Sequence, residues 1–261
     1  SAFYNNTTIT NVHIGNSVTS IGYSAFRGAT NLSSVSFELD SQLTTIGTWA
    51  FSGTTSLASI DIPDSVTTIG NNVFNGATAL TIIAIHDTVT SIGSSAFRNA
   101  RSLNSITFGA GSILNNIGND AFYGASALTT IVIPDGVLSI GANAFYNARS
   151  LSSITFGADS ILNNIGQSAF NGATSLTSIA IPDRVNSIGN TVFYNASNLS
   201  SITFGVNSQL ASIGTGVFRY TALTIIAIPD TVNSIGADAF QNTGLTTVIL
   251  TQNLTIAGTE Y

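Results

Sequence analysis

A repeat of 22 to 25 residues runs through the whole chain and constrains its fold more than any other feature. The pair Ile-Gly occurs eleven times, and in ten of these a Phe follows the Gly four positions later. One earlier Phe extends this Phe column to eleven members: Phe3, Phe26, Phe51, Phe74, Phe97, Phe122, Phe145, Phe170, Phe193, Phe218 and Phe240. A period of this length is typical of a solenoid, in which each unit buries its apolar face only by stacking on its neighbours.

The repeats occur in two lengths that carry different residues. The short form reads I-x-I-P-D-x-V-x-x-I-G, as at Ile179 to Gly189, and the long form reads I-x-F-G-x-x-S-x-L-x-x-I-G, as at Ile154 to Gly166. The four Phe outside the column lie in long repeats, and the four Pro lie in short ones: Phe37, Phe108, Phe156 and Phe204; Pro63, Pro134, Pro182 and Pro229. We expect the extra Phe to fill the wider section of a long coil. Segments 98–145 and 146–193 match at most positions, which indicates duplication of a long–short pair.

Each unit reads as a strand, a turn and a return segment. Ile179 and Ile181 lie on one face of a strand by the two-residue period, and their β-branched side chains favour that conformation. Pro182 then ends the strand because it has no N–H to donate. Gly189 permits either a positive φ or a close approach of backbones. One Phe per coil is expected to fill the interior between the strand and the return segment.

The composition excludes several classes of protein. The chain has 12 acidic residues, 6 Arg and no Lys, and its pI is about 4.4, so it lacks the clustered positive charge that nucleic-acid binding requires. It has no Cys, which excludes disulfides, thiol catalysis and Cys-ligated metals. No apolar run is long enough for a membrane-spanning helix. Only 7% of residues are charged, so Ser, Thr and Asn must cover the surface.

The combined pattern L-x-x-I-x-I-P-x-x-V-x-x-I-G-x-x-A-F-x-G resembles the leucine-rich repeat of the BspA-like (treponemal-type) family, from Phe3 to about Leu250. The resemblance implies a horseshoe or superhelical leucine-rich-repeat solenoid of ten to eleven repeats, with a parallel β-sheet on its concave face and little helix. It also implies an extracellular or cell-surface location and adhesion to host matrix proteins or other cells. Family repeats often carry Cys after the Phe, where this chain has residues such as Ala148 and Ala173.

We expect residues 1–261 to form one solenoid domain. The sequence starts in the middle of a repeat and shows neither a signal peptide nor a polar cap. We therefore expect it to be a fragment of a longer surface protein. Uncapped ends expose strand edges, which would allow end-to-end self-association.

Two surfaces are candidates for ligand binding. The first is the concave face, whose outward positions are small and uncharged: Ser105, Thr107, Thr130, Val132, Ser153, Thr155, Ser178, Ala180, Ser201 and Thr203. Such a smooth face could hold a protein or a glycan. The competing interpretation is that these residues are generic filler, because binding hot spots are usually aromatic residues and Arg.

The second candidate is an edge formed by residues that directly follow the Phe column. It carries Arg98, Tyr123, Tyr146, Tyr194 and Arg219, which are hot-spot residue types. The competing interpretation is that the Tyr rings cover the Phe column while their hydroxyls reach water.

No set of residues predicts catalysis. His13 and His86 lie three repeats apart, and the register gives neither of them a nucleophile and carboxylate partner. The Asp that follows Pro in short repeats is interpreted as turn chemistry rather than as a calcium site. We expect no enzyme activity, metal or cofactor. The sequence favours an adhesion module for an extracellular matrix protein or a cell-surface glycoprotein; the alternative is a structural spacer or self-associating stalk without a specific ligand.

Overall fold

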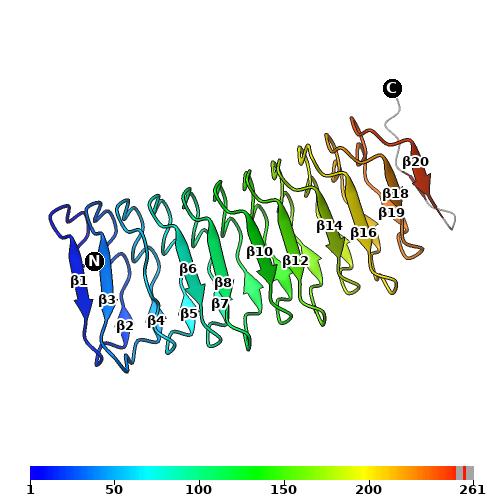
Figure 1. Ribbon diagram of the computed structural model, residues 1–261. Coiled ribbons are helices and arrows are strands. Elements are labelled where there is room, and N and C mark those ends of the chain that lie inside the picture. The colour runs from blue at the N-terminus through cyan, green and yellow to red at the C-terminus, as the bar shows by residue number, and fades with distance from the viewer. Residues whose placement is uncertain (251–254, 257–261) are drawn as a thin grey trace.

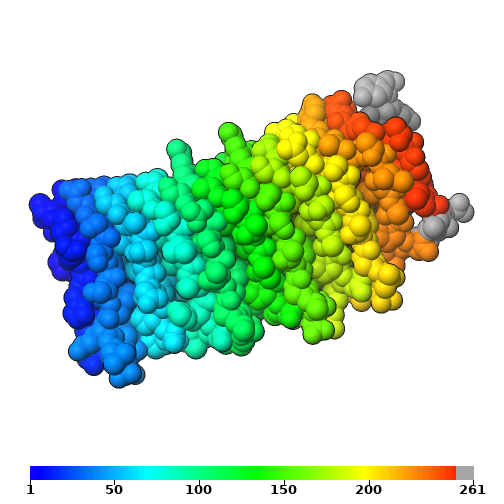
Figure 2. Space-filling model, viewed as in Figure 1, coloured from blue at the N-terminus to red at the C-terminus, as the bar shows by residue number. Residues whose placement is uncertain are grey.

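The computed structural model describes residues 1–250 and the strand Thr255–Ile256. It is an elongated stack of coils that runs from one end of the molecule to the other, as Figure 1 shows. The space-filling view in Figure 2 shows one unbroken body. The described residues contain strands and turns but no helix, which confirms the predicted repeat solenoid.

One side of the stack is built from the strands that the L-x-x-I-x-I segments predict. Their residues alternate between the core and the surface, so Ile179 and Ile181 are buried while Ser178 and Ala180 are exposed. These strands are β1 (Asn11–Ile14), β3 (Ser34–Phe37), β6 (Ile82–Ile85), β8 (Ser105–Phe108), β10 (Thr130–Ile133), β12 (Ser153–Phe156), β14 (Ser178–Ile181), β16 (Ser201–Phe204), β18 (Ile225–Ala227) and β20 (Thr247–Ile249).

A second side of the stack is one continuous parallel sheet made by the two-residue segments that end at the recurring Ile. Its eleven two-residue strands are β2 (Ser20–Ile21), β4 (Thr45–Ile46), β5 (Thr68–Ile69), β7 (Ser91–Ile92), β9 (Asn116–Ile117), β11 (Ser139–Ile140), β13 (Asn164–Ile165), β15 (Ser187–Ile188), β17 (Ser212–Ile213), β19 (Ser234–Ile235) and β21 (Thr255–Ile256). From Gly47 to Gly236, the Gly after each of these Ile residues allows a close approach of neighbouring coils. A Cβ on Gly166 would lie 2.6 Å from the Ala142 nitrogen, so no larger residue fits there without displacing backbone.

The longer strands do not form one continuous sheet. They pair as β1–β3, β6–β8, β10–β12, β14–β16 and β18–β20, and each pair joins a short coil to the coil that follows it. At the steps from a long to a short coil, proline removes one of the ladder donors. At the step from a short to a long coil, the Gly157 N–H donates to the Ile133 carbonyl at 3.2 Å. At the next step, Pro182 occupies the equivalent donor position and has no N–H, so the carbonyl of Phe156 gains no ladder bond from it.

A third ladder joins the turn segments around the Phe column. In each coil, three alternate N–H groups donate forward to the next coil, as Asn143, Phe145 and Asn147 do at 2.7 to 2.8 Å. Two of these three positions require a left-handed backbone, and Asn143 and Asn147 have φ values of 55° and 56°. Asn and Gly tolerate this conformation, which explains their recurrence beside the Phe column.

The core of the stack is a ladder of Phe rings. Neighbouring rings of the Phe column have centroids 5.1 to 5.7 Å apart and are parallel to within 14°. The rings from Phe51 to Phe218 are completely buried, whereas Phe3 is 40% exposed. The extra Phe of the long coils lie elsewhere: they are half-buried and pack against the outside of the core, so they do not fill the interior as expected.

Candidate functional site

The ten residues predicted for the concave face do lie together on one surface, here called the strand face. They come from β8, β10, β12, β14 and β16, and the register aligns them within each hydrogen-bonded strand pair, with Thr130 opposite Ser153 and Val132 opposite Thr155. Ser105 and Ser153 are half-buried, and the other eight are exposed. Val132, at 60% exposure, is the most apolar point among the ten.

The predicted edge of Tyr and Arg residues also assembles, but as stacked clusters rather than as free side chains. The guanidinium of Arg98 lies 3.9 Å from the centroid of the Tyr123 ring, and that ring stacks on Tyr146 at 4.8 Å. Arg98 Nη1 also lies 3.4 Å from an Asp120 carboxylate oxygen. The Arg charge is therefore partly neutralised within the edge, and the rings cover the turn segments beneath them.

Arg219 makes a second cluster at this Tyr–Arg edge. Its guanidinium lies 5.9 Å from the ring centroid of Tyr194 and 5.1 Å from that of Tyr220, and Asp238 lies 3.9 Å away. The hydrogen bond to the Tyr220 hydroxyl, with a smaller contribution from the Asp238 carboxylate, raises the pKa of Arg219.

The sequence pattern that predicts this edge does not include Trp49 and Tyr220, which also belong to it. The guanidinium of Arg27 stacks over Trp49 at 4.4 Å, as Arg219 does over Tyr220. Both aromatic residues occupy left-handed turn positions, with φ values of 62°, rather than the position after the Phe. The left-handed backbone at these two positions, which the sequence does not reveal, directs both side chains toward the same edge.

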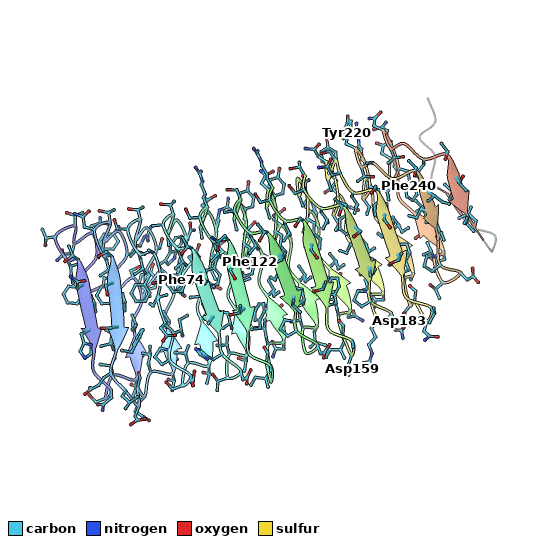
Figure 3. All side chains as sticks on the ribbon, in the orientation of Figure 1. Phe74, Phe122, Asp159, Asp183, Tyr220 and Phe240 are labelled. Carbon is cyan, nitrogen blue, oxygen red and sulfur yellow. The ribbon has the colours of Figure 1, made fainter. Side chains whose placement is uncertain are left out.

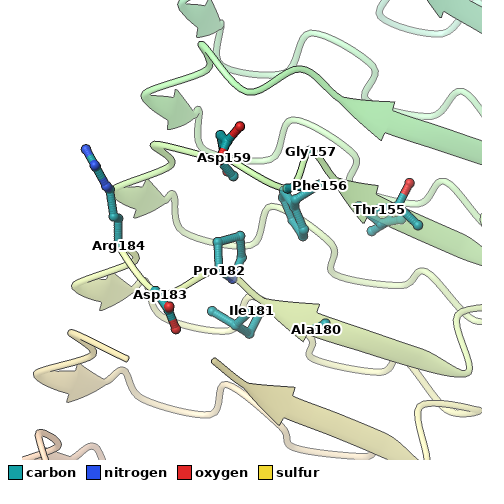
Figure 4. A pocket seen from close by; sticks show the side chains of 12 residues that line it. Thr155, Phe156, Gly157, Asp159, Ala180, Ile181, Pro182, Asp183 and Arg184 are labelled. Atoms are coloured by element: carbon teal, nitrogen blue, oxygen red, sulfur yellow. The ribbon is translucent and has the colours of Figure 1, made fainter. Parts of the chain in front are cut away.

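The structure contains a feature that the sequence reasoning did not predict: a hollow wherever a long coil is followed by a short one. Each hollow lies between the extra Phe of the long coil and the Pro of the short coil, and the four volumes range from about 430 to 710 Å³. Figure 4 shows the hollow between β12 and β14, with Phe156 and Pro182 on its walls. The hollows occur at the steps where the strand ladder is interrupted.

The loop that borders each of the later hollows is held by an Asp from the preceding short coil. The Asp135 carboxylate accepts the Asp159 N–H at 3.2 Å, and Asp183 accepts the Asn207 N–H at 3.2 Å. The Gly that follows the extra Phe makes room for this contact, because a Cβ on Gly157 would collide with the Asp135 carboxylate. The Asp of the short repeats therefore acts between coils, and not only within its own turn.

Charge is divided between two edges of the stack. Eight of the twelve acidic residues lie in the loops that follow the longer strands, or the equivalent segment 60–62, and define the acidic edge: Glu38, Asp40, Asp64, Asp87, Asp135, Asp159, Asp183 and Asp230. Arg184 is the one Arg in these loops, and the other five Arg lie in the turn segments around or after the Phe column. Figure 3 shows Asp159 and Asp183 at one edge and Tyr220 at the opposite one.

Both His side chains have a polar partner in the neighbouring coil. His86 Nδ1 lies 2.6 Å from an Asp64 oxygen, and His13 bonds Ser36 at 3.0 Å. Within residues 1–250, no group of three His, Cys, Asp or Glu side chains could hold a metal ion. The described part of the chain also contains no helix that is long and apolar enough to span a bilayer.

The stacked strands, the Phe ladder and the repeat motif together define a leucine-rich-repeat solenoid. A family model described as the BspA-type leucine-rich repeat region matches residues 1–115 and 115–247. The chain therefore belongs to the BspA-type leucine-rich repeat family, as its motif predicted. Among curated proteins, no sequence relative was found.

Solved structures of bacterial proteins share this fold. A leucine-rich cell surface protein from Faecalibacterium prausnitzii is 28% identical, with a TM-score of 0.60, and the match covers 96% of this chain and 82% of that one. Leucine-rich repeat proteins from Bacteroides ovatus and Eubacterium ventriosum are 24% and 23% identical, with TM-scores of 0.58 and 0.60. These matches cover 95% and 94% of this chain, and 83% and 79% of the others.

Proposed function

We propose that this protein is a non-enzymatic binding module at the cell surface, which holds a host matrix protein or a cell-surface glycoprotein along its solenoid. The strand face is the observation that supports this proposal. It presents mostly small, exposed or half-buried residues on strands that are hydrogen-bonded in pairs. The fold is common to binding scaffolds, and the similar F. prausnitzii protein is described as a cell surface protein.

A rigid, repetitive face suits adhesion in which the affinity comes from many weak contacts over a large contact area. Side chains such as Ser178 and Ala180 lose little rotamer entropy on contact, so ordering them costs little free energy. A partner that follows several coils would add many small contributions, and shape complementarity rather than one strong contact would set its affinity.

A biosensor panel of immobilised matrix proteins and cell-surface glycoproteins tests the proposal. Saturable binding should appear and should be lost when Ser153→Arg and Thr155→Arg place two bulky charges in the middle of the strand face. The matched control carries the same two added charges as Thr174→Arg and Ser197→Arg, in the turns where Arg101 and Arg149 occupy equivalent positions.

Each result has a direct consequence. Loss of binding in the first variant alone supports the strand face as the contact surface. Equal loss in both variants would mean that added charge, and not this face, controls binding. No binding across the panel would contradict the adhesive function and favour a spacer or self-associating stalk, which sedimentation at several protein concentrations would then detect.

A further inference from the structure

We propose that the acidic edge binds an extended, basic, proline-rich segment of a partner protein, in the polyproline II conformation, with one Pro in each hollow. This inference rests on the proposed binding function and names the chemistry of the partner. Four properties of the edge support it: the spacing of the hollows, their apolar walls, their unpaired backbone acceptors and their negative charge.

The spacing of the hollows matches the pitch of a polyproline II helix. The hollows at Phe108, Phe156 and Phe204 recur every 48 residues, which is two coils. Two steps along the continuous sheet of short strands span about 10 Å. One turn of polyproline II contains three residues and rises about 9 Å, so every third side chain would reach the next hollow. A β-strand of three residues covers the same distance but turns alternate side chains away.

The spacing between the first hollow and the second differs from the spacing between the later hollows. Phe37 precedes Phe108 by 71 residues, which is three coils, because two short coils follow each other there. A segment that fits the later three hollows in register therefore cannot place a Pro in the first one. The proposed binding site is limited to the three hollows between β8 and β18, whose volumes are about 430, 530 and 460 Å³.

The walls of each hollow resemble the surfaces that hold proline-rich peptides. A half-buried Phe ring faces a Pro ring, and an Ile side chain lies at the base, as Phe156, Pro182 and Ile181 do in Figure 4. Grooves lined by aromatic residues are the usual partners of polyproline II segments, which enter them with little loss of backbone entropy.

Each hollow also offers a backbone acceptor. The Phe156 carbonyl lacks the ladder donor that Pro182 cannot supply. A polyproline II chain makes no internal hydrogen bonds, so the N–H of a non-proline residue is free to donate to such a carbonyl. An α-helix laid along the edge would have its N–H groups already paired, which makes the extended conformation the better fit.

Charge complementarity selects a basic segment. Asp135, Asp159, Asp183 and Asp230 lie along the three hollows, and Arg184 is the one positive side chain among them. Arg residues placed between the prolines would pair with these carboxylates. Because the edge is exposed, this attraction should weaken as the salt concentration rises.

Titration calorimetry with synthetic peptides tests the inference on the full chain. The probe is four repeats of Pro-Ala-Arg. A peptide of identical composition with irregular Pro spacing tests the register, four repeats of Pro-Ala-Glu test the charge, and an Arg-rich amphipathic helix tests the conformation. We expect measurable binding of the first peptide, at least about tenfold weaker binding of the other three, and loss of affinity in high salt.

Variants locate the site. Ala110→Arg, Ala158→Arg and Val206→Arg place a cationic side chain in each of the three hollows and should weaken peptide binding at least about tenfold. The matched variant Ser126→Arg, Thr174→Arg and Ser197→Arg adds the same charge in turns that carry Arg in other coils, and it should bind normally. Arg184→Gln removes the positive charge from the edge and should tighten binding.

Equal binding of the regular and irregular peptides, preference for the helix, or insensitivity to the hollow variants would overturn the inference. Circular dichroism of each variant separates loss of binding from loss of fold. The matrix-protein panel is independent of these peptides. A positive panel with a negative peptide titration would reject this inference and leave the proposed function standing.

Discussion

The Phe ladder makes a prediction that depends on position along the stack. Phe145 has no exposed surface, and the neighbouring rings of Phe122 and Phe170 lie 5.1 and 5.3 Å away. Phe3 is 40% exposed and has one ring neighbour, Phe26, at 5.2 Å. Removing the two rings should therefore have very different effects on the free energy of unfolding.

The magnitudes follow from burial. Phe145→Ala leaves a cavity closed on both sides by packed coils, so it should cost about 3–5 kcal/mol. Phe3→Ala removes a ring that already contacts water, and the terminal coil can fray without disturbing the rest, so it should cost about 1 kcal/mol or less. Phe156→Ala should lie between the two, because its ring is half-buried at a hollow.

Urea denaturation followed by circular dichroism measures these differences. With an m-value on the order of 3 kcal/mol per molar urea, Phe145→Ala should lower the midpoint by about 1 M or more. Phe3→Ala should shift it by a few tenths molar. Equal midpoints for Phe145→Ala and Phe3→Ala would refute the reasoning, because they would show that the ring ladder does not carry the stability of the stack.

Three further predictions concern contacts outside the ladder. Gly157→Ala should cost about 1–3 kcal/mol in urea titration because the new Cβ meets the Asp135 carboxylate, and the double variant with Asp135→Ala should cost less than the sum of the single changes. Thr191→Asn should stabilise by about 0.5–1 kcal/mol, since a β-branched residue is strained at a φ of 54°; a lower melting temperature would contradict this. Arg98→Ala should cost about 1 kcal/mol through loss of its stacking on Tyr123, whereas no change in melting temperature would show that the stack contributes nothing.

The architecture could be predicted because the sequence contains about ten copies of the repeat, so the residue type at each repeat position can be compared across them. Strand faces such as Ile179 and Ile181 follow from a two-residue period, and the close approach at Gly189 from its recurrence. The register also predicted that residues such as Thr155 and Ala180 would share one face. Whether that face binds a ligand remains a prediction.

Features that depend on contacts between unlike coils could not be predicted in the same way. The sequence shows that Phe156 and Pro182 are 26 residues apart. It does not show that the Phe156 carbonyl lacks a ladder donor because Pro182, at the facing position, has no N–H. The length of a long coil predicts an interior position for its extra Phe, whereas in the structure this Phe is half-buried and packs against the core. The contact of Asp135 with the loop at Gly157 likewise crosses from a short coil to a long one.

The turn ladder gives every coil a direction. Its N–H groups at positions such as Asn143, Phe145 and Asn147 all bond the coil ahead, whereas the Ile-Gly corner bonds the coil behind, as Gly166 does with Ile140 at 2.8 Å. A coil can therefore be joined to others in only one orientation, yet each long–short pair presents the same two surfaces to its neighbours. Tandem copying of such a pair lengthens the rod without creating a mismatched junction, which is consistent with the match of segments 98–145 and 146–193 at most positions. The length of the solenoid can thus change by whole long–short pairs, while its width and surface chemistry stay the same.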